Sequence, residues 1–224
     1  RPEGLGTDGA RGDSFGADPR TRDGLLLAGF DVITLANNHL GDYGPQSLVE
    51  TVRLIRESGI QVTGAGANVA AASTPVVVER DGVRFGFVAF DAIGETPAAG
   101  PQTPGAYRLR MQPRTGPLQQ ADLDAVLGSV RTLATQADVV MVAAHWGTQY
   151  TTELVPDQQT VARALVDAGA DVVLGGHPHW VQGAELRGES LIAYSLGNFV
   201  FDMTFMQQTQ EGVGVPSINT AVSA

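Results

Sequence analysis

Residues 171–180 read DVVLGGHPHW, and the fold that we expect follows from this stretch. A run of aliphatic side chains, typical of a buried strand, ends at Gly175 and Gly176, and two histidines follow. The same order of Asp-Val, buried strand and polar motif occurs in DVITLANNH from Asp31 and in DVVMVAAHW from Asp138. Each copy follows a segment that is predicted to be helical. This alternation indicates an α/β fold with parallel strands.

The other elements are predicted from apolar periodicity and turn residues. An Asp81-Gly82 turn indicates a hairpin within residues 74–90. We expect helices at 19–29, 45–59, 118–137 and 156–169, strands at 31–36, 60–66, 138–144 and 171–176, and two further strands about Gly188-Glu189 within 181–201. Residues 91–117 are predicted to form a long loop, and a single domain is expected at 19–202, between a tail (1–18) and a segment of uncertain structure (203–224).

Composition and charge exclude several classes of function. The 224-residue chain has a formal net charge of −10 and no cysteine, which argues against nucleic acid as a partner and excludes thiol catalysis. No apolar run approaches the roughly 18 residues of a membrane span, and no signal peptide is visible from Arg1 onward. We therefore expect membrane association only through a segment absent from this chain. An anionic substrate would need local positive charge, which a bound metal ion could supply.

All four histidines of the chain lie just beyond the end of a predicted strand: His39, His145, His177 and His179. Ligand sites in open α/β sheets form along this edge. Pro178 predicts an extended His177, so that the imidazoles of His177 and His179 face the same side. Neutral imidazole binds Zn, Fe, Mn or Ni, and we interpret the histidines as candidate metal ligands.

The same residues also have structural interpretations. His145 alone could be a capping or packing residue, and the NNH of residues 37–39 could form a turn, because Asn tolerates left-handed conformations. Trp146 and Trp180 follow two of the histidines closely. We expect them to be packing walls of the site, with substrate stacking as the alternative.

Four motifs together resemble a known family. They are LANNHLGDYG (35–44), AAHWGTQY (143–150), LGGHPHWVQ (174–182) and YSLGNFVFD (194–202). They look like the CapA family of capsule and poly-γ-glutamate synthesis proteins, which is similar to the calcineurin-like metallophosphoesterases. The resemblance covers about residues 20–202. It implies a four-layer α/β/β/α sandwich of two mixed sheets and a centre of one or two divalent ions (Mn, Fe or Zn).

The resemblance also implies roles for individual residues. The metal ligands would be Asn38, His145, His177 and His179, and His39 would be the general acid for the leaving group. Residues that touch the substrate or support the ligands would be Asn37, Asp42, Trp146 and Asn198, with Asp202 at the rim; Gly197-Asn198 could equally be a simple turn.

The chain departs from the family in its acidic motifs. The superfamily begins with Asp-x-His and Gly-Asp motifs, and CapA-like proteins carry Gly-Asp and then Asn-Leu-Glu. Gly12-Asp13 is not preceded by a buried strand, so we interpret it as part of a loop. The first strands, and the carboxylate ligands that they carry, are expected upstream of Arg1.

Three functions remain open from the sequence. The first is a metal-dependent hydrolase of phosphoester type, acting on an envelope polymer or another phosphoester. The second is a non-catalytic scaffold or export component of capsule polymer synthesis with a vestigial metal site, and the third is a purely structural zinc site. The chain has no P-loop and no Gly-x-Ser-x-Gly elbow. The resemblance implies other capsule synthesis components as partners and the extracytoplasmic face of the bacterial envelope as the location.

Overall fold

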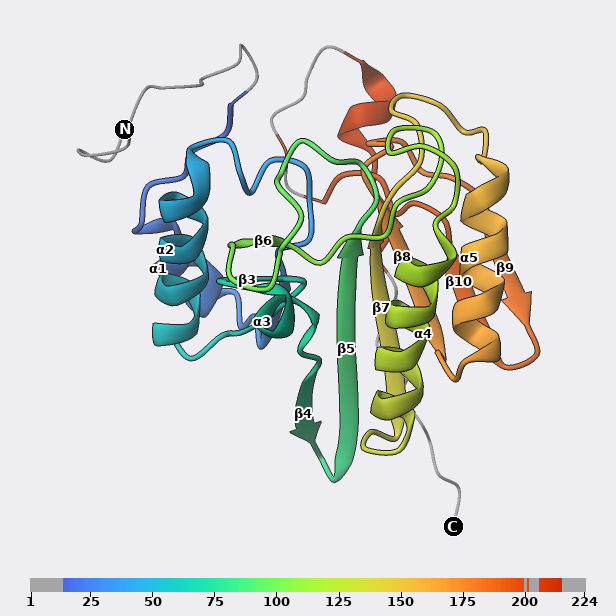
Figure 1. Ribbon diagram of the computed structural model, residues 1–224, viewed down its shortest axis with the longest axis horizontal. Coiled ribbons are helices and arrows are strands. Elements are labelled where there is room, and N and C mark those ends of the chain that lie inside the picture. The colour runs from blue at the N-terminus through green and yellow to red at the C-terminus, as the bar shows by residue number, and fades with distance from the viewer. Residues whose placement is uncertain (1–13, 200, 202–205, 215–224) are drawn as a thin grey trace.

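The centre of the protein is a six-stranded mixed sheet (Figure 1), seen in a computed structural model that describes residues 14–199, 201 and 206–214. The strand order is β4-β5-β7-β8-β10-β9. Strands β5, β7, β8 and β10 run parallel, and the edge strands β4 and β9 pair antiparallel. The predicted α/β class with a mixed sheet is confirmed. The strands are β4 (Val76–Arg80), β5 (Val83–Asp91), β7 (Val139–His145), β8 (Val172–Gly176), β9 (Ala184–Arg187) and β10 (Ser190–Ala193).

Two short sheets lie beside the large one. Strand β1 (Val32–Thr34) pairs in parallel with β2 (Gln61–Thr63), and β3 (Ala65–Gly66) pairs antiparallel with β6 (Gly105–Ala106). The strand predicted at 60–66 is therefore divided at Gly64, whose φ of 88° interrupts the extended backbone. Within the described residues, β1 has β2 as its partner and does not join the large sheet.

Helices cover one face of the large sheet. Helices α4 (Gln120–Ala134) and α5 (Pro156–Asp167) lie in front of the part of the large sheet that contains β7, β8 and β10, whereas α1 (Thr21–Leu27) and α2 (Gly44–Glu57) lie with the short sheets (Figure 1). These four helices were predicted. The short α3 (Val69–Ser73) was not predicted, and its start is fixed by the Asn68 side chain, which accepts a hydrogen bond from the backbone N–H of Ala71 at 2.9 Å. A 3₁₀ turn, η1, spans Gln207–Gln210.

The main core lies between the helices and the sheet. Burial alternates along β7, so that Val140, Val142 and Ala144 are buried, while Met141, Ala143 and His145 are only half-buried. Full burial of one such aliphatic side chain is worth about 1.5–3 kcal/mol. The core members from the two helices include Leu123, Val126, Val130, Leu133, Val161 and Leu165. A cavity of about 430 Å³ is lined mostly by apolar side chains of β1, β7 and β8 and reaches His145.

Both predicted hairpins are present. Asp81 and Gly82 have φ values of 53° and 79°, as a two-residue type I′ turn requires, and they join β4 to β5. Strands β9 and β10 join at Gly188, which has a φ of 63°.

In the described part of the chain, none of the helices combines the length and apolar character that a membrane crossing demands.

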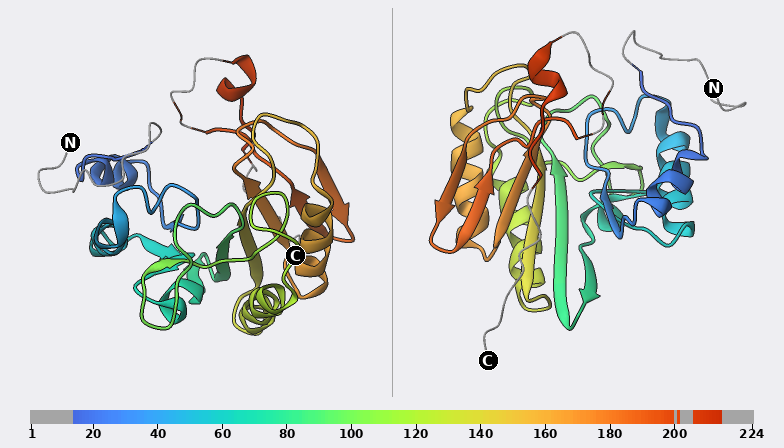
Figure 2. Two further views of the ribbon diagram at one scale, coloured as in Figure 1. Left: turned by 45° about the horizontal axis from the view of Figure 1, so that its top comes forward. Right: turned by 180° about the vertical axis from the view of Figure 1, so that it is seen from behind.

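The register of the parallel strands determines where the polar motifs meet. Asp91 at the end of β5 lies opposite His145 at the end of β7, and His145 lies opposite Gly176 at the end of β8. These carboxyl ends share one edge of the sheet, which both views in Figure 2 show beneath the long connecting loops. The side chains that follow the three strands therefore gather at that edge.

Candidate metal centre

Four of the predicted site residues meet at this edge, although they come from three separate segments. The Nε2 atom of His145 lies 2.8 Å from the Oδ1 atom of Asn38, which follows β1. The ring centroids of His145 and His177 are 4.9 Å apart, and those of His177 and His179 are 6.1 Å apart. The structure thus brings together Asn38 and the three histidines that the sequence analysis selected as candidate ligands.

Burial keeps two of these imidazoles neutral. It lowers the pKa of His145 well below its usual value, and repulsion from the other three histidines acts in the same direction. Burial likewise lowers the pKa of His177 to about 3, with further contributions from His179, Arg114 and His39. A neutral imidazole is the form that binds a metal ion, so both rings have the charge that ligation requires.

The expectation that His177 is extended is wrong. His177 and His179 have φ values of 95° and 62°, which are left-handed conformations that non-glycine residues rarely adopt. Backbone hydrogen bonds hold this turn in place: Trp146 donates to the carbonyl of Gly176 at 3.1 Å, and Tyr150 donates to the carbonyl of Pro178 at 2.8 Å. The chain therefore folds back immediately after β8, and the two rings still reach one site.

Asn198 selects the tautomer of His179. The amide nitrogen of Asn198 donates to the carbonyl of Thr209 at 2.8 Å, so its Oδ1 atom faces His179 Nδ1, also at 2.8 Å. In the neutral ring, Nδ1 must then carry the proton, and Nε2 has the lone pair that a metal ion needs. The ring also stacks on Tyr150, with centroids 5.8 Å apart. Asn198 thus has a supporting position behind a candidate ligand.

His39 lies beside this group and is held by its own loop. Its Nδ1 atom is 3.0 Å from a carboxylate oxygen of Asp42, which also accepts from the backbone N–H of Phe15 at 2.8 Å. The Oδ1 atom of Asn37 accepts from the backbone N–H groups of His39 and Leu40, both at 2.9 Å. Asn37 therefore shapes the turn, and Asp42 orients the imidazole so that Nε2 points away from the loop.

Trp146 is a core residue. It is fully buried, its indole N–H donates to the carbonyl of Tyr194 at 2.9 Å, and its ring packs edge-on against Phe90. This position suits a packing wall and leaves no face on which a substrate could stack. Trp180 is half-buried, and its indole nitrogen is buried without a hydrogen-bond partner among the described residues.

The donor atoms lie close enough together to contact one ion after a small adjustment. Two ligands that lie about 2.1 Å from one ion are roughly 3.0–3.4 Å apart for angles of about 90–110°, slightly more than the 2.8 Å hydrogen-bond distance between His145 Nε2 and Asn38 Oδ1. The Nε2 atom of His177 is buried and has no hydrogen-bond partner in the described part of the chain. An unmatched buried polar atom costs about 1–3 kcal/mol, and ligation would remove that cost.

The described residues hold only part of a donor set. Among residues 14–199, 201 and 206–214, no group of three or more His, Asp or Glu side chains is arranged to hold a metal ion. The candidate cluster contains an asparagine, and the ring centroids of its neighbouring histidines are 4.9 Å and 6.1 Å apart. The predicted rim residue Asp202 and the loop residues Gly12 and Asp13 lie outside the described residues.

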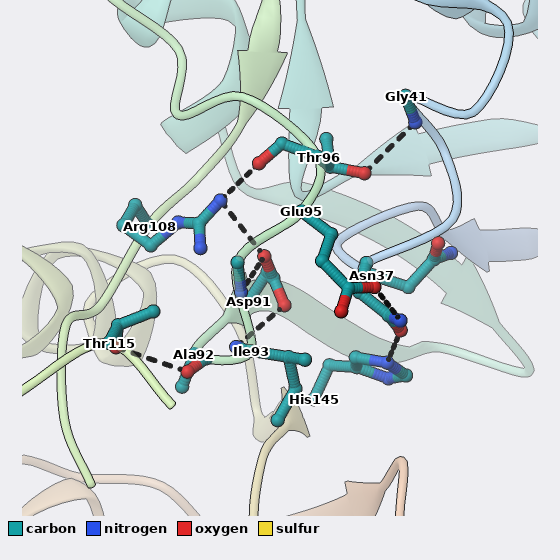
Figure 3. Close-up of polar contacts among 12 residues, drawn as sticks. Asn37, Gly41, Asp91, Ala92, Ile93, Glu95, Thr96, Arg108, Thr115 and His145 are labelled. Carbon is teal, nitrogen blue, oxygen red and sulfur yellow. Dashed lines mark hydrogen bonds and ion pairs between the residues drawn. The ribbon is translucent and has the colours of Figure 1, made fainter. Parts of the chain in front are cut away.

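Four charged residues at the site were not predicted, and all lie within residues 91–117; Figure 3 shows Asp91, Glu95 and Arg108. Burial raises the pKa of Asp91 to about 6 against the opposing effect of Arg108, whose guanidinium lies 3.1 Å away. Glu95 accepts from the Nδ2 atom of Asn38 at 2.9 Å and forms an ion pair with Arg114 at 2.5 Å. The sequence contained one signal for Asp91, since FVAFD ends a buried strand on a polar residue as the histidine motifs do.

Comparisons with known proteins define the class. The family model described as "Bacterial capsule synthesis protein PGA_cap" matches residues 5–203. The capsule biosynthesis protein CapA of Bacillus anthracis is 36% identical over 187 residues, which cover 83% of this chain and 44% of that protein. The PGA biosynthesis protein CapA of Bacillus subtilis is 34% identical over 175 residues, covering 77% of this chain and 43% of that protein.

The chain belongs to this family of bacterial capsule synthesis proteins. It spans less than half the length of these two relatives. Among solved structures, the NAD nucleotidase NadN of Haemophilus influenzae aligns with a TM-score of 0.46 and 14% identity, covering 74% of this chain and 30% of that chain. A likeness at that level carries no argument about activity.

Proposed function

We propose that this chain contributes a His/Asn metal centre to a metal-dependent hydrolase of phosphoester type that acts in the synthesis of a capsule or poly-γ-glutamate polymer. The ligands would be Asn38, His145, His177 and His179, and the metal would be Mn, Fe or Zn. The substrate would be an envelope polymer or a related phosphoester, and the site would operate at the extracytoplasmic face of the envelope together with other capsule synthesis components.

The observation that carries this proposal is the convergence of the Asn38 oxygen and two neutral imidazoles at one sheet edge. His145 Nε2 and Asn38 Oδ1 face each other at 2.8 Å, and the buried His177 Nε2 has no partner among the described residues. A purely structural cluster would be expected to satisfy its polar atoms internally. The names of the relatives support a role in capsule or polymer synthesis but do not specify the reaction.

The side chains divide the chemical work between them. A divalent ion bound by the four donors would supply a nucleophilic water and positive charge for the phosphoryl oxygens. His39 would donate a proton from Nε2 to the leaving oxygen, because Asp42 already occupies its Nδ1 atom. Asn198 would keep His179 in the tautomer whose Nε2 is a donor. The negative charge of the whole chain makes this local positive charge necessary for binding an anion.

Metal content and turnover test the proposal together. The protein is loaded with Mn²⁺ or Zn²⁺, desalted and analysed for metal by elemental analysis, and hydrolysis of bis(p-nitrophenyl) phosphate is then followed. His177→Ala and His179→Ala should each lower the metal stoichiometry, whereas Gln210→Ala, an exposed residue on η1, should not. Unchanged metal content in both histidine variants would eliminate the ligand assignment.

The second candidate function is a non-catalytic scaffold of polymer synthesis. It is favoured by the incomplete donor set, since no three His, Asp or Glu side chains among the described residues are arranged to hold a metal ion together. Bound metal without turnover of the phosphodiester, by a protein of the full length of its relatives, would support the scaffold and reject the hydrolase. If the protein binds metal but His39→Ala does not change any rate of hydrolysis, the site would be purely structural.

A further inference from the structure

The loop that follows β5 brings an acidic side chain against a candidate ligand. Glu95 lies in this loop with a φ of 70°, next to Gly94 with a φ of 90°. Its Oε2 atom accepts a hydrogen bond from the Nδ2 atom of Asn38 at 2.9 Å, and Asn38 is 57 residues away in the sequence. Figure 3 shows Glu95 and His145 close together, and the two side chains contact the same asparagine amide. A left-handed non-glycine residue at such a position points to a functional constraint.

The carboxylate determines which way the amide faces. The oxygen and nitrogen of an asparagine amide have nearly the same shape, so their positions follow from their partners. An ionised carboxylate only accepts hydrogen bonds, and therefore the NH₂ group of Asn38 must face Glu95. Its Oδ1 atom then faces His145 Nε2, which must carry the proton in the metal-free protein. The reversed amide would present two donor hydrogens, instead of an oxygen, to His145 and to a cation.

Buried charge holds the loop in its turn. Asp91 is fully buried, and its carboxylate accepts from the backbone N–H groups of Ile93 at 3.0 Å and Gly94 at 3.3 Å. The guanidinium of Arg108 lies 3.1 Å from the same carboxylate and is itself only 11% exposed. Because these contacts fix the residues just before Glu95, its backbone position does not depend on the side chain of Glu95.

Two further contacts complete the placement of Glu95. Arg108 also donates to the carbonyl of Thr96, and the Thr96 hydroxyl accepts from the backbone N–H of Gly41 at 2.9 Å. The loop after β5 is thereby joined to the loop that carries Asn38. On its outer side, Glu95 Oε1 accepts from Arg114 at 2.5 Å, and this leaves Oε2 for Asn38.

We propose that Glu95 is a positioning residue, which orients the Asn38 carboxamide so that its oxygen faces the metal side of the site and thereby sets the tautomer of His145. The effect of Glu95 on metal affinity rests on the proposed function, but its effects on the orientation of the Asn38 amide and on the tautomer of His145 do not require a metal ion. The substitution Glu95→Gln has a specific consequence. Arg114 only donates, so it retains the oxygen of the new amide, and the NH₂ group of that amide then faces Asn38. Asn38 must reverse, and His145 Nε2 becomes an acceptor.

The first measurement uses the metal-free protein. In ¹⁵N spectra of the histidine side chains, assigned with a His145→Gln variant, wild-type His145 should show a protonated Nε2. In Glu95→Gln, this signal should move to the range of an unprotonated nitrogen, with Nδ1 protonated instead. The matched control is Glu50→Gln, which alters an exposed carboxylate paired with Arg53 on α2 and should leave the signal unchanged. A protonated Nε2 in Glu95→Gln would overturn the inference.

The second measurement is the affinity for Mn²⁺ by calorimetry. Loss of a residue that orients a ligand typically costs about 10- to 100-fold in metal affinity, and we expect a loss in this range for Glu95→Gln. Glu95→Ala should lose less, because it frees the amide without reversing it. A merely structural role predicts the opposite order, with the nearly isosteric Gln milder than Ala. If wild-type protein binds no Mn²⁺ but the Nε2 signal still changes, the proposed function fails while the positioning role stands.

Discussion

Acidification of the metal-free protein should destabilise it through His177, and the sign follows from the direction of the pKa shift. The imidazole is 6% exposed, and burial lowers its pKa to about 3, whereas an unfolded histidine titrates near 6.5. Below about pH 6.5 the unfolded chain therefore binds a proton that the folded chain does not. The stability that His177 contributes is present above about pH 6.5 and is lost as the pH falls towards 3.

The magnitude of this loss can be worked out for a moderate pH change. The value pH 5 lies about 1.5 units below the pKa of the unfolded imidazole, and each unit corresponds to about 1.4 kcal/mol. The free energy of unfolding is therefore about 2 kcal/mol lower at pH 5 than at pH 7. Urea denaturation in EDTA should show that the wild-type advantage over His177→Gln shrinks by this amount between pH 7 and pH 5. Val52→Ala, which removes buried volume from the α2 cluster without a titrating group, should run parallel to wild type. Parallel curves for His177→Gln as well would refute the reasoning.

Three other substitutions test the packing and the chemistry of the site. Gly175→Ala should lower the free energy of unfolding in urea by at least about 3 kcal/mol or prevent folding, because its Cβ atom would lie 1.8 Å from the carbonyl oxygen of Tyr194. As a control, a Cβ atom at Gly183 would meet nothing within 4 Å, so Gly183→Ala should change the free energy of unfolding by less than about 0.5 kcal/mol. Trp146→Phe removes the hydrogen bond to that carbonyl and leaves space in the core, and we expect a loss of about 2–4 kcal/mol in urea denaturation. His39→Ala should preserve metal content and slow the hydrolysis of phosphodiesters with poor leaving groups most, as measured with a series of aryl esters; an equal loss for good and poor leaving groups would contradict its role as an acid.

The elements of the fold could be predicted because their signals are local. Helical periodicity and turn residues within a few positions of each other located the four longer helices and both hairpins. The three Asp-Val motifs also located the strand ends near which the histidines lie. The short α3 was not predicted, because its five residues are too few to show helical apolar periodicity, and only the cap at Asn68 marks its start.

Features that depend on distant contacts could not be predicted in the same way. Pro178 favours an extended residue before it, but the hydrogen bonds that reach Gly176 and Pro178 from another loop impose a turn on His177. Strand β1 resembles β7 and β8 in sequence, yet it pairs with β2, because strand pairing depends on the whole arrangement and not on the composition of one strand.

The acidic residues beside the site, Asp91 and Glu95, were not predicted for a similar reason. Residues 91–117 contain many prolines and no periodicity, so a loop could be predicted but not the direction of its side chains. The contact of Glu95 with Asn38 joins two loops 57 residues apart, and nothing in either segment indicates the other. Only the order of the parallel strands brings Asp91 next to His145.

Backbone strain provides an argument for function that is independent of any relative. Five non-glycine residues among those described have a positive φ: Asp81, Glu95, Tyr150, His177 and His179. The hairpin turn accounts for Asp81, and the other four surround one site, where each costs on the order of 1–3 kcal/mol. Folding alone would favour relaxed loops and satisfied imidazoles, yet here strain coincides with the unmatched Nε2 atom of His177. A ligand that accepts a nitrogen lone pair would remove the cost of this unmatched atom on binding, and a metal cation has that property.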